Sequence, residues 1–427
     1  MKVLVIGGGG REHALIWTLS RSPRVTELYC APGNAGTAEL AENVDLSVED
    51  TEGLLAFALE AGIDLTVVGP EVPLMNGLSD RFRQSGLAVF GPSARAAAIE
   101  GSKDLAKDIM NRHGIPTAAC RTFTDAHKAC EFVRRENRAF VVKADGLAAG
   151  KGVVVAETVE ETCGAIRSML EGHTMGDAGA RVLVEEILEG PEISVLAFTD
   201  GHSVIPMVWS QDHKRVFDGD KGPNTGGMGA YSPPKYHTPE LADEIGRTIL
   251  QPIVRALKEE DRMYQGVLYA GLMLTHEGPK VLEFNARFGD PEAQVVLMRL
   301  ETDLVDIMEA VLEERLSSCP VHWDRRATAG VVLASGGYPG SYQTGIPIEG
   351  LELNLPDTLV FHAGTRLEEG RLVTAGGRVL TVCAWGDTLE EAVSRAYRRA
   401  DAISFSGMHR RGDIGWRSLY PDSSGEA

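Results

Sequence analysis

The stretch KVLEFNARFGDPE, residues 280–292, sets a carboxylate, an amide and a guanidinium at alternate positions. In a β-strand successive side chains point to opposite faces, so this spacing predicts that Glu283, Asn285 and Arg287 share one face. On the opposite face fall the apolar residues Leu282, Phe284 and Ala286. A carboxylate and an amide oxygen two residues apart suit Mg²⁺, which completes its shell with phosphate oxygens and water. The alternative is a half-exposed strand with solvated polar side chains, and the GDPE turn that follows favours the metal site.

A second stretch, FVVKADGLAAGKGVVV at residues 140–155, carries a lysine and several glycines between two runs of valine. It fails as a P-loop because three residues separate Gly146 from Gly150, and because Lys151 precedes Gly152 rather than Ser or Thr. A β-branched run then follows where a P-loop needs a helix. We therefore expect a strand, a glycine turn and a returning strand, a hairpin whose tip can fold over a ligand.

Four glycines follow the first strand of the chain. GGGGREHAL opens a helix directly after the apolar run KVLVI, where backbone amides and the helix dipole favour a phosphate. It is a poor dinucleotide fingerprint, since Glu12 or His13 occupies the third glycine position and the second strand ends in APGNAG without an acidic residue. A plain tight turn is the alternative.

The segment SQDHKR, residues 210–215, combines an acid and two bases, and the glycine-rich GPNTGGMGAYSP follows it. Glycines beside charge suit a close approach of the backbone to a ligand, although a solvated turn is the alternative. His13 and His213 have no partner at metal-ligand spacing, so we expect them to pack or to form hydrogen bonds.

Composition argues against several classes of protein. The 427 residues include 42 Lys and Arg against 61 Asp and Glu, a net charge of 42 − 61 = −19, which argues against a nucleic-acid partner or an anionic membrane. An anionic small-molecule substrate must then be held by local positive groups. The six cysteines are scattered without zinc spacing and no apolar run approaches a membrane span, so we expect reduced thiols and a cytoplasmic protein.

The elements that must position these residues fall into three segments. Strand and helix patterns alternate over residues 1–101, which predicts an open parallel sheet with the glycine loops at the carboxyl ends of its strands. Residues 102–320 open with a capped helix in GSKDLAKDIMNRHGIPT, contain a small unit at 116–190, and include the long helix PELADEIGRTILQPIVRALKEE, which Pro252 can kink. Residues 321–427 are expected to form a separate α+β domain. The expected fold class is therefore α/β and α+β in several domains.

Ten motifs occur in order along essentially the whole chain: GGGGREHAL, APGNAGT, GPEVPL, KADGLAAGKGV, SQDHKR, GPNTGGMGAYSP, YAGLM, EFNARFGDPE, GGYPG and FHAGT. Together they resemble the phosphoribosylamine–glycine ligase family, ATP-grasp enzymes of purine biosynthesis. The resemblance implies a Rossmann-like substrate domain over residues 1–101, an ATP-grasp core of two α+β units over 102–320 with 116–190 as its lid subdomain, and a C-terminal α+β domain over 321–427. One departure is Gly8, where Asn or Ser is commoner, which affects a contact in the first loop and not the expected function.

The family resemblance implies ATP-dependent ligation of glycine to 5-phosphoribosylamine, giving glycinamide ribonucleotide, ADP and phosphate through glycyl phosphate. It implies Mg²⁺ or Mn²⁺, small-molecule partners, no nucleic acid or membrane, and a monomer. Two alternatives stay open: another ATP-grasp carboxylate–amine ligase of nucleotide synthesis, and a nucleotide-binding protein without catalysis. The broken fingerprint argues against a third, an oxidoreductase with a dinucleotide in the first loop.

The resemblance also implies roles for single residues in binding ATP. The glycine hairpin resembles a lid over the triphosphate, with Lys103 and Lys143 on the phosphates. The backbone of the hinge LVEEIL would hydrogen-bond adenine, and Glu192 would hold the ribose hydroxyls. The residues implied for ATP are Lys103, Lys143, Gly146, Gly150, Gly152, Glu185, Glu186, Leu188 and Glu192.

Other residues would hold the remaining substrates. The N-terminal loops and DHKR would bind phosphoribosylamine, and the residues after the metal pair would meet the glycine carboxylate. The residues implied are Gly9, Gly10, Arg11, Gly33, Asn34, Pro70, Glu71, Asp212, Lys214, Arg287, Gly289, Asp290 and Pro291. Glu283 and Asn285 match the metal ligands of the family, and the expected catalytic residues are Lys143, Asp212 and Arg287.

Overall fold

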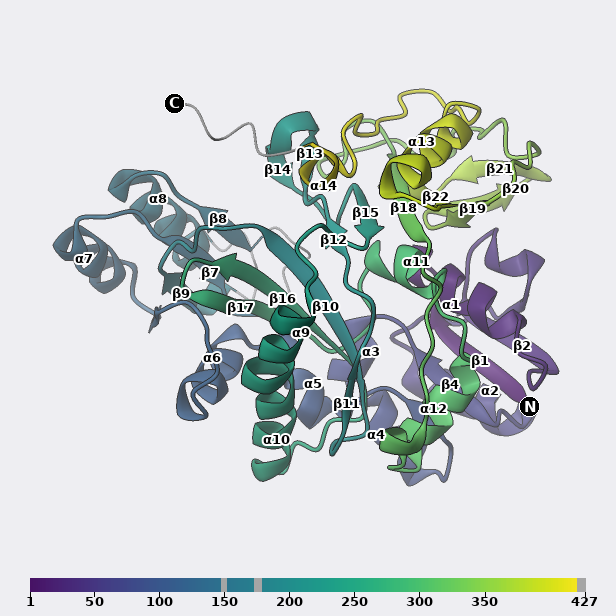
Figure 1. Cartoon of the computed structure of the whole chain (residues 1–427), viewed down its shortest axis with the longest axis horizontal. Helices are drawn as coiled ribbons and strands as arrows, with labels where there is room; N and C mark the ends of the chain where they lie inside the picture. Colours follow the sequence, from purple (N-terminus) through teal and green to yellow (C-terminus); the bar gives the residue numbers. More distant parts are fainter. Residues whose placement is uncertain (147–151, 173–178, 421–427) are drawn as a thin grey trace.

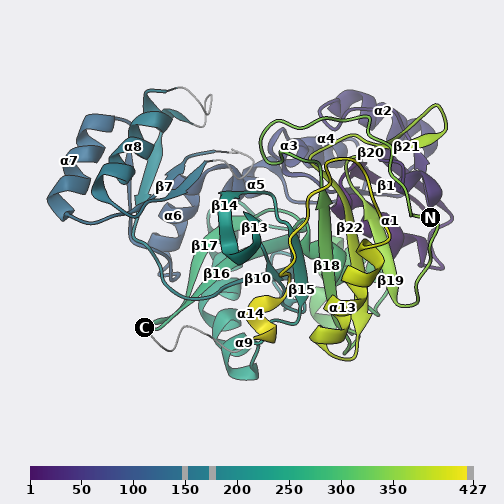
Figure 2. The same cartoon turned by 90° about the horizontal axis from the view of Figure 1, so that it is seen from above.

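The computed structural model describes residues 1–146, 152–172 and 179–420. The N-terminal segment and most of the C-terminal elements lie at one end of the molecule (Figure 1). A small unit that includes residues 126–136 and 159–170 lies at the other end, and the view from above agrees (Figure 2). The rest of residues 102–320 joins the two ends.

The first segment folds into a five-stranded parallel sheet of order β3-β2-β1-β4-β5, as the alternating pattern predicts. The carboxyl ends of its strands meet at one edge, where the loops after β1, β2 and β4 lie. The strands are β1 (Lys2–Gly7), β2 (Glu27–Pro32), β3 (Glu42–Asn43), β4 (Leu65–Val68) and β5 (Val89–Phe90). The helices are α1 (Gly10–Ser20), the 3₁₀ turn η1 (Thr37–Glu39), α2 (Thr51–Ala61), α3 (Glu71–Met75), α4 (Leu78–Gln84) and α5 (Ala94–Gly101).

The small unit consists of a four-stranded antiparallel sheet of order β6-β9-β7-β8 covered by α7 and α8. In α7 the apolar residues recur every three or four positions, so one face of the helix is buried against the sheet. Strands β7 and β8 form the predicted hairpin, and its tip lies outside the described residues. The elements are β6 (Cys120–Phe123), α7 (Ala126–Glu136), β7 (Val141–Ala144), β8 (Val153–Val155), α8 (Val159–Leu170) and β9 (Val182–Glu185).

A second antiparallel sheet, of order β11-β10-β16-β17, forms the centre of the molecule. Helix α6 (Lys103–Arg112) precedes the small unit and is capped by Ser102 as predicted, since the Ser102 hydroxyl accepts a hydrogen bond from the N–H of Leu105 at 3.1 Å. The strands are β10 (Glu192–Thr199), β11 (Val204–Pro206), β16 (Gly266–Thr275) and β17 (Gly278–Asn285).

The predicted helix at 239–260 is continuous but contains a π turn before Pro252. Helix α9 (Pro239–Ile245) runs into a π turn (Gly246–Leu250), and α10 (Gln251–Glu259) follows. Pro252 has no N–H to bond back to the preceding turn, so widening that turn accommodates it without a break. The apolar residues that recur along one face of this helix are buried at Ile245, Ile249, Ile253 and Leu257, and Leu241 is half-buried.

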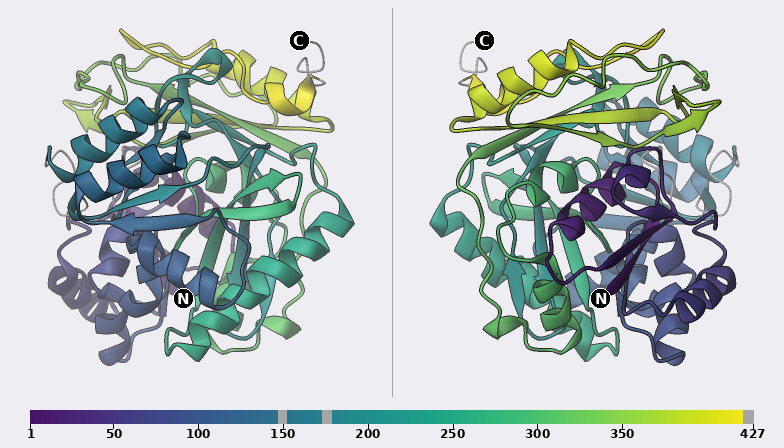
Figure 3. Two further views of the ribbon diagram at one scale, coloured as in Figure 1. Left: turned by 90° about the vertical axis from the view of Figure 1, so that its left-hand side faces the viewer. Right: turned by 90° about the vertical axis from the view of Figure 1, so that its right-hand side faces the viewer.

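The third sheet has the order β12-β15-β18-β22-β19 and combines strands from distant parts of the chain. Strands β12 (Gln211–Asp212) and β15 (Gly229–Ser232) belong to the middle segment. Strand β15 pairs with the C-terminal strand β18, and β12 pairs with β15 at the edge of the same sheet, which lies towards the top of both views in Figure 3. The others are β18 (Ala327–Ala334), β19 (Thr358–His362) and β22 (Arg378–Gly386). The remaining elements are β13 (Arg215–Phe217), the 3₁₀ turn η3 (Asp218–Asp220), β14 (Lys221–Asn224), α11 (Glu292–Leu297), α12 (Leu304–Leu312), the 3₁₀ turn η5 (Leu316–Ser318), β20 (Thr365–Glu368), β21 (Arg371–Thr374), α13 (Leu389–Ala400) and α14 (Trp416–Leu419).

The N-terminal and C-terminal parts are joined through two histidines. His13 of α1 is buried, and its Nδ1 accepts a hydrogen bond from the N–H of His362 at 2.8 Å. His13 therefore forms a hydrogen bond, as the sequence suggested. Burial, with a smaller contribution from His362, lowers the pKa of His13 to about 3, and burial lowers that of His362 to about 4.

All six cysteines are unpaired, and five of them are buried. Among the described residues, no helix has the length and apolar character that a bilayer crossing requires.

We predict that the stability of this junction falls in mild acid. Because the folded pKa of His13 lies below its unfolded value of about 6.5, the unfolded chain binds the extra proton between those values and stability is lost as the pH falls. From pH 7 to 5 this amounts to about 2 kcal/mol for one histidine. Urea unfolding of wild type and His13→Asn should show a weaker loss in the variant, and equal losses would contradict the assignment.

Candidate active site

The predicted metal pair lies at the end of β17. Glu283 pairs with Gly271 of β16 and Asn285 with Tyr269, and both side chains are half-buried. The register of the two strands is irregular at this point, and Leu282 has no partner residue on β16. Leu282 is therefore half-buried, whereas Phe284 and Ala286 are buried on the apolar face as predicted. The extra residue of this β-bulge could not be inferred from simple alternation.

Positive charge surrounds Glu283. Burial alone would raise the pKa of this carboxyl, but Lys214, Lys143, Lys103 and Arg287 hold the pKa below its usual value. Within residues 1–146, 152–172 and 179–420, the side chains of Glu283 and Asn285 have no hydrogen bond or ion pair. Their oxygens are thus available to a hard cation that also binds phosphate, and the pair fits a divalent metal.

No group of three or more His, Cys, Asp and Glu side chains in the described parts of the chain is arranged to hold a metal. This finding fits a site that uses one carboxylate and one amide and leaves most of the metal's coordination shell to a ligand and water.

Two lysines form ion pairs with Glu185, the last residue of β9, and a third lies on the neighbouring helix α6. Lys143 Nζ lies 3.0 Å from Glu185 Oε2 and donates to the carbonyl of Leu282 at 3.0 Å, next to Glu283. Lys107, which the sequence analysis did not single out, lies 3.1 Å from the same carboxylate oxygen, and burial lowers its pKa. Lys103 donates to the carbonyl of Gly146 at 2.8 Å, so it reaches the glycine hairpin from α6.

A second charged group surrounds Lys214. Its Nζ contacts Glu192 Oε1 and lies 3.6 Å from Asp212 Oδ1. Burial raises the pKa values of Asp212 and Glu192 although Lys214 opposes this, and the two carboxylates in turn raise the pKa of Lys214 against the effect of burial. The structure therefore brings together a residue predicted for the ribose of ATP and two predicted for the other substrate.

Arg287 bridges two carboxylates from the N-terminal segment. Its Nε donates to Glu71 Oε2 at 3.0 Å, and its Nη2 lies 3.0 Å from Glu100 Oε1. Glu100 also accepts the N–H of Ala286 at 2.6 Å, and burial raises its pKa. Glu71 and Arg287 were both predicted to bind substrate, and they are in direct contact across 216 positions of sequence. Glu100 was missed because it is a single acid in the alanine-rich helix α5.

Family models match most of the chain. The N domain of phosphoribosylglycinamide synthetase matches residues 1–100, its ATP-grasp (A) domain residues 101–293, and its C domain residues 328–417. The chain belongs to the phosphoribosylglycinamide synthetase family. The family resemblance inferred from the ten motifs is confirmed.

Individual relatives of the phosphoribosylglycinamide synthetase family match over nearly their whole length. A phosphoribosylamine–glycine ligase of Vibrio parahaemolyticus is 52% identical over 423 residues, covering 98% of this chain and 99% of the relative. One of Halalkalibacterium halodurans is 53% identical over 420 residues, covering 98% and 97%.

Solved structures agree on the fold. The crystal structure of a phosphoribosylamine–glycine ligase from Thermotoga maritima matches with a TM-score of 0.84 at 33% identity, covering 96% of this chain and 99% of that one. The biotin carboxylase domain of the Hydrogenobacter thermophilus 2-oxoglutarate carboxylase gives a TM-score of 0.73 at 18% identity, covering 96% and 91%, which shows the common fold alone. The predicted multidomain fold class with an ATP-grasp core is confirmed.

The first loop of this phosphoribosylglycinamide synthetase chain meets the turn after β17. A Cβ atom at Gly9 would lie 3.5 Å from Asp290 Oδ2, and one at Gly10 would lie 2.5 Å from Gln294 Nε2. Arg11 is buried and donates to the carbonyl of Phe288 at 3.2 Å. The glycines therefore allow the two predicted substrate segments to touch.

The loop after β2 holds the loop after β1 in place through Asn34. Asn34 donates to the carbonyls of Gly8 and His362 at 3.0 and 2.9 Å, and its side-chain oxygen accepts two N–H groups from its own loop. A Cβ atom at Gly8 would lie 2.6 Å from the carbonyl oxygen of Gly33, so glycine at position 8 lets these loops approach closely. Pro70 occupies the N-cap position of α3, directly before Glu71.

Several predicted residues lie in the connection between the two ATP-grasp sheets. The hinge residues Glu185 to Leu188 lead from β9 towards β10, and Glu186 accepts the N–H of Ala119 at 2.9 Å.

The predicted glycines belong to the hairpin of β7 and β8. The carbonyl of Gly152 accepts the N–H of Ala144 at 2.8 Å, and Gly146 has a φ of 134°. Gly150 lies outside the described residues.

Arg378 of β22 was not anticipated either. Its Nη2 lies 2.9 Å from Asp290 Oδ2, and its Nη1 donates to the carbonyls of Asp290 and Gly226 at 2.8 and 2.6 Å. Burial alone would raise the pKa of Asp290, but Arg378 and Arg11 hold it below its usual value. A strand of the C domain thus fixes the turn that contains Gly289, Asp290 and Pro291.

We predict that Gly227→Ala is strongly destabilising. Gly227 has a φ of 114°, and an added Cβ atom would lie 2.4 Å from Pro291 Cδ, so the variant combines backbone strain with a clash. Chemical unfolding should show a loss of about 2–4 kcal/mol. Gly246→Ala is the matched control, because Gly246 is helical and nothing lies within 4 Å of an added Cβ, so stability should be unchanged or higher. Equal effects at the two positions would show that backbone strain and the clash with Pro291 do not determine the loss of stability.

Proposed function

We propose that this chain ligates glycine to 5-phosphoribosylamine at the expense of ATP, giving glycinamide ribonucleotide, ADP and phosphate in purine biosynthesis. The observation that carries the proposal is Glu283, an ionised carboxylate beside four positive side chains and without a bonded partner in the described chain. Such a group suits a divalent metal with a polyphosphate. Membership of the phosphoribosylglycinamide synthetase family, and relatives named phosphoribosylamine–glycine ligase, support the two other substrates.

ATP is proposed to bind between the small unit and the central sheet. Lys103 approaches this region from α6 and Lys143 from β7, one beside Gly146 and the other beside the backbone of β17. Both lysines are therefore near Glu283 and can hold phosphate oxygens. The hinge backbone from Glu185 to Leu188 would hydrogen-bond adenine, Glu186 and Gly146 to Gly152 would complete the nucleotide site, and Glu192 would hold the ribose.

Glu283 and Asn285 are proposed to hold Mg²⁺ or Mn²⁺. When bound, the cation would neutralise charge on the phosphates during transfer. The lysines would add to this effect, since phosphoryl transfer depends chiefly on positioning and electrostatics.

The glycine carboxylate is proposed to attack the γ-phosphate, with Arg287 as its binding group. A guanidinium has five N–H donors. Arg287 directs one N–H from each of its three nitrogens towards Glu71, Glu100 and the carbonyl of Phe288. Donors therefore remain for a substrate carboxylate, and the two acids fix the plane of the guanidinium. The neighbouring turn Gly289 to Pro291 completes this subsite.

Phosphorylation turns a poor electrophile into a good one, because phosphate leaves more readily than an oxide ion. The amine of phosphoribosylamine then attacks glycyl phosphate and phosphate departs. Asp212 and Lys214 are proposed to hold phosphoribosylamine together with the N-terminal loops, including Gly9 to Arg11, Gly33, Asn34 and Pro70. Exclusion of water protects the acyl phosphate until the amine arrives.

We further propose domain limits of 1–101, 102–320 with a lid at 116–190, and 321–427, and a monomer in the cytoplasm. The parallel sheet of residues 1–101 and the first C-terminal strand, β18, support the limits. The unpaired cysteines are compatible with a reducing compartment.

ADP release tests the proposed function directly. The full chain is assayed with ATP, Mg²⁺ and glycine, with and without phosphoribosylamine generated in place from ribose 5-phosphate and ammonia. ADP and glycinamide ribonucleotide should form together when all substrates are present. Turnover with another carboxylate and amine but not with these substrates would favour a different ATP-grasp ligase, and ATP binding without turnover would favour a non-catalytic protein.

We predict that Glu283→Ala and Asn285→Ala each lower kcat/KM about a hundredfold or more while the fold is retained. Each variant removes one proposed metal ligand, and the loss of one such transition-state contact costs about 3 kcal/mol. Glu277→Ala is the control, because Glu277 lies at the other end of β17, where it pairs with Lys280 at an exposed turn. Activity close to wild type in either site variant at saturating metal would refute the metal assignment.

We predict that phosphate released from glycine labelled with ¹⁸O in its carboxylate carries one labelled oxygen per turnover. In the proposed route a carboxylate oxygen becomes the bridge of glycyl phosphate and leaves with phosphorus when the amine attacks. Mass spectrometry of inorganic phosphate measures the transfer. Phosphate without label, with the expelled carboxylate oxygen found instead in water or ADP, would exclude the acyl phosphate.

A further inference from the structure

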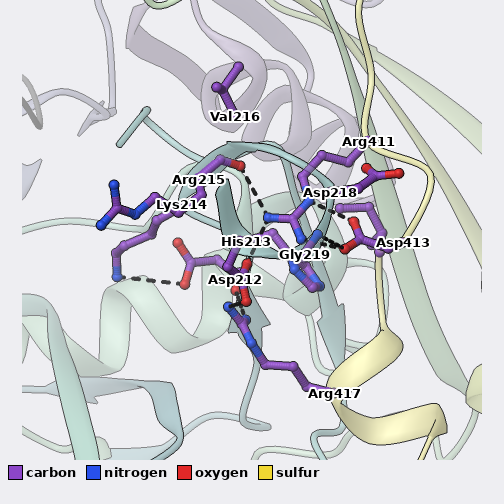
Figure 4. A network of polar contacts seen from close by, with 12 residues as sticks. Asp212, His213, Lys214, Arg215, Val216, Asp218, Gly219, Arg411, Asp413 and Arg417 are labelled. Atoms are coloured by element: carbon purple, nitrogen blue, oxygen red, sulfur yellow. Dashed lines mark hydrogen bonds and ion pairs between the residues drawn. The ribbon is translucent and has the colours of Figure 1, made fainter. Parts of the chain in front are cut away.

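The last part of the described chain returns across the loop that carries Asp212 and Lys214. We call residues 409–418 the C-terminal strap and residues 212–220 the substrate loop. Figure 4 shows Arg411, Asp413 and Arg417 of the strap pointing into the substrate loop. The strap follows α13 and lies about 190 residues further along the chain than the residues it contacts.

Arg411 is the anchor of the strap and is fully buried. Its Nε and Nη2 donate to the two oxygens of Asp413, each at 2.7 Å. Its Nη1 donates to Asp220 Oδ1 at 2.8 Å and to the carbonyl of Arg215 at 3.1 Å. Removing a buried cation from water is costly unless carboxylates and acceptors surround it, so this arrangement fixes both segments against each other.

Arg417 holds the substrate loop at its beginning. Its Nη1 donates to the carbonyl of Asp212 at 3.0 Å, and its Nη2 donates to Asp220 Oδ2 at 2.7 Å. Asp220 therefore accepts from both arginines of the strap, one on each carboxylate oxygen.

The residue between Asp212 and Lys214 is held as well. The N–H of Gly415 donates to His213 Nε2 at 3.0 Å, and His213 is fully buried. Burial lowers the pKa of His213 well below its usual value, which keeps the imidazole neutral and able to accept this bond. His213 thus forms a hydrogen bond, as the sequence suggested, and its partner belongs to the strap.

Hydrogen bonds to the carbonyls of Asp212 and Arg215 and to the side chain of His213 therefore hold the chain on both sides of Lys214. The side-chain nitrogen of Lys214 is directed instead to Glu192 and Asp212. The strap contacts two carbonyls of the loop and the side chains of His213 and Asp220, and it leaves the charged ends of Asp212 and Lys214 to the site. A small shift of the loop would therefore weaken the contacts of Asp212 and Lys214 with a bound substrate.

We propose that Arg411 and Arg417 are positioning residues for phosphoribosylamine: they set the backbone of the substrate loop so that Asp212 and Lys214 meet this substrate. The inference rests on the proposed function, and it assigns to the strap a part in substrate affinity in addition to its part in folding.

The test is steady-state kinetics of the full chain with Arg417→Met, which keeps an apolar stem and removes both hydrogen bonds. The KM for phosphoribosylamine should rise about tenfold, with kcat within about threefold of wild type, because the reacting groups are intact. Arg417→Lys retains the positive charge and one donor nitrogen, so it should recover part of the affinity for phosphoribosylamine. Arg395→Met is the matched control: Arg395 is exposed to 26% against 24% for Arg417, and its partners Glu391, Asp357 and Trp385 lie outside the substrate loop.

An unchanged KM in Arg417→Met, or a rise equal to that in Arg395→Met, would overturn the proposal, even if the melting temperature fell. Asp220→Asn is the second variant, because it weakens both arginines from the loop side and should raise the same KM if Arg417→Met does not fold. Wild-type chain that forms no glycinamide ribonucleotide would refute the proposed function itself. Wild-type product with an unaltered KM in both variants would refute the strap alone.

Discussion

Positive charge gathered beside Glu283 is the feature on which the rest of the structure depends. In a chain of net charge −19, three lysines and an arginine are brought close enough to one carboxyl to lower its pKa despite burial. Burying such cations without counter-ions would cost several kcal/mol each. The structure provides carboxylates for Lys143, Lys214 and Arg287, namely Glu185, Glu192, Glu71 and Glu100. These pairs hold the cations in place before any anionic ligand arrives, which is the preorganisation that catalysis by electrostatics requires.

Those carboxylates come from three parts of the chain. Glu71 follows a strand of the parallel sheet, Glu185 ends β9 of the small unit, and Glu192 begins β10 of the central sheet. The third sheet contributes Asp212 through β12, and its strand β22 contributes Arg378 to the turn after β17. Each sheet therefore presents a strand end or an adjoining loop to the same region, and the phosphoribosylglycinamide synthetase fold determines which charges meet there.

The sequence predicted those parts of the site in which chemistry and local geometry coincide. Alternation along one strand was enough to place Glu283 and Asn285 on a common face, and the parallel sheet followed from the repeated strand and helix patterns. The bulge at Leu282 depends on pairing with β16, so no local pattern could indicate it. The π turn before Pro252 is a similar case, because a missing N–H group does not by itself indicate which hydrogen bonds the preceding turn will form.

Long-range partners were missed for a different reason. Glu100 and Lys107 are single charges in ordinary helices, and Arg411 stands in a segment with no motif at all. Their importance comes from partners as far as 196 positions away, and spacing within a short window carries no information about such contacts. Motifs therefore indicated which groups are candidates for binding, whereas the residues that hold those groups in place could be found only from the structure.

The pairing of β15 with β18 has a consequence for how the chain matures during synthesis. Strand β15 ends at residue 232 and its neighbour β18 begins at residue 327, so nearly a hundred residues must be made before this edge of the sheet can close. The contacts at residues 411–417 require more than eighty residues beyond the start of β18. The parallel sheet and the central sheet can form early from segments already emerged, because domains fold as units from the N-terminus onward. A nascent chain can thus form the strand that carries Glu283 and Asn285 before residues 411–417 fix the loop that carries Asp212, and a chain that stops short of residue 411 would lack those contacts.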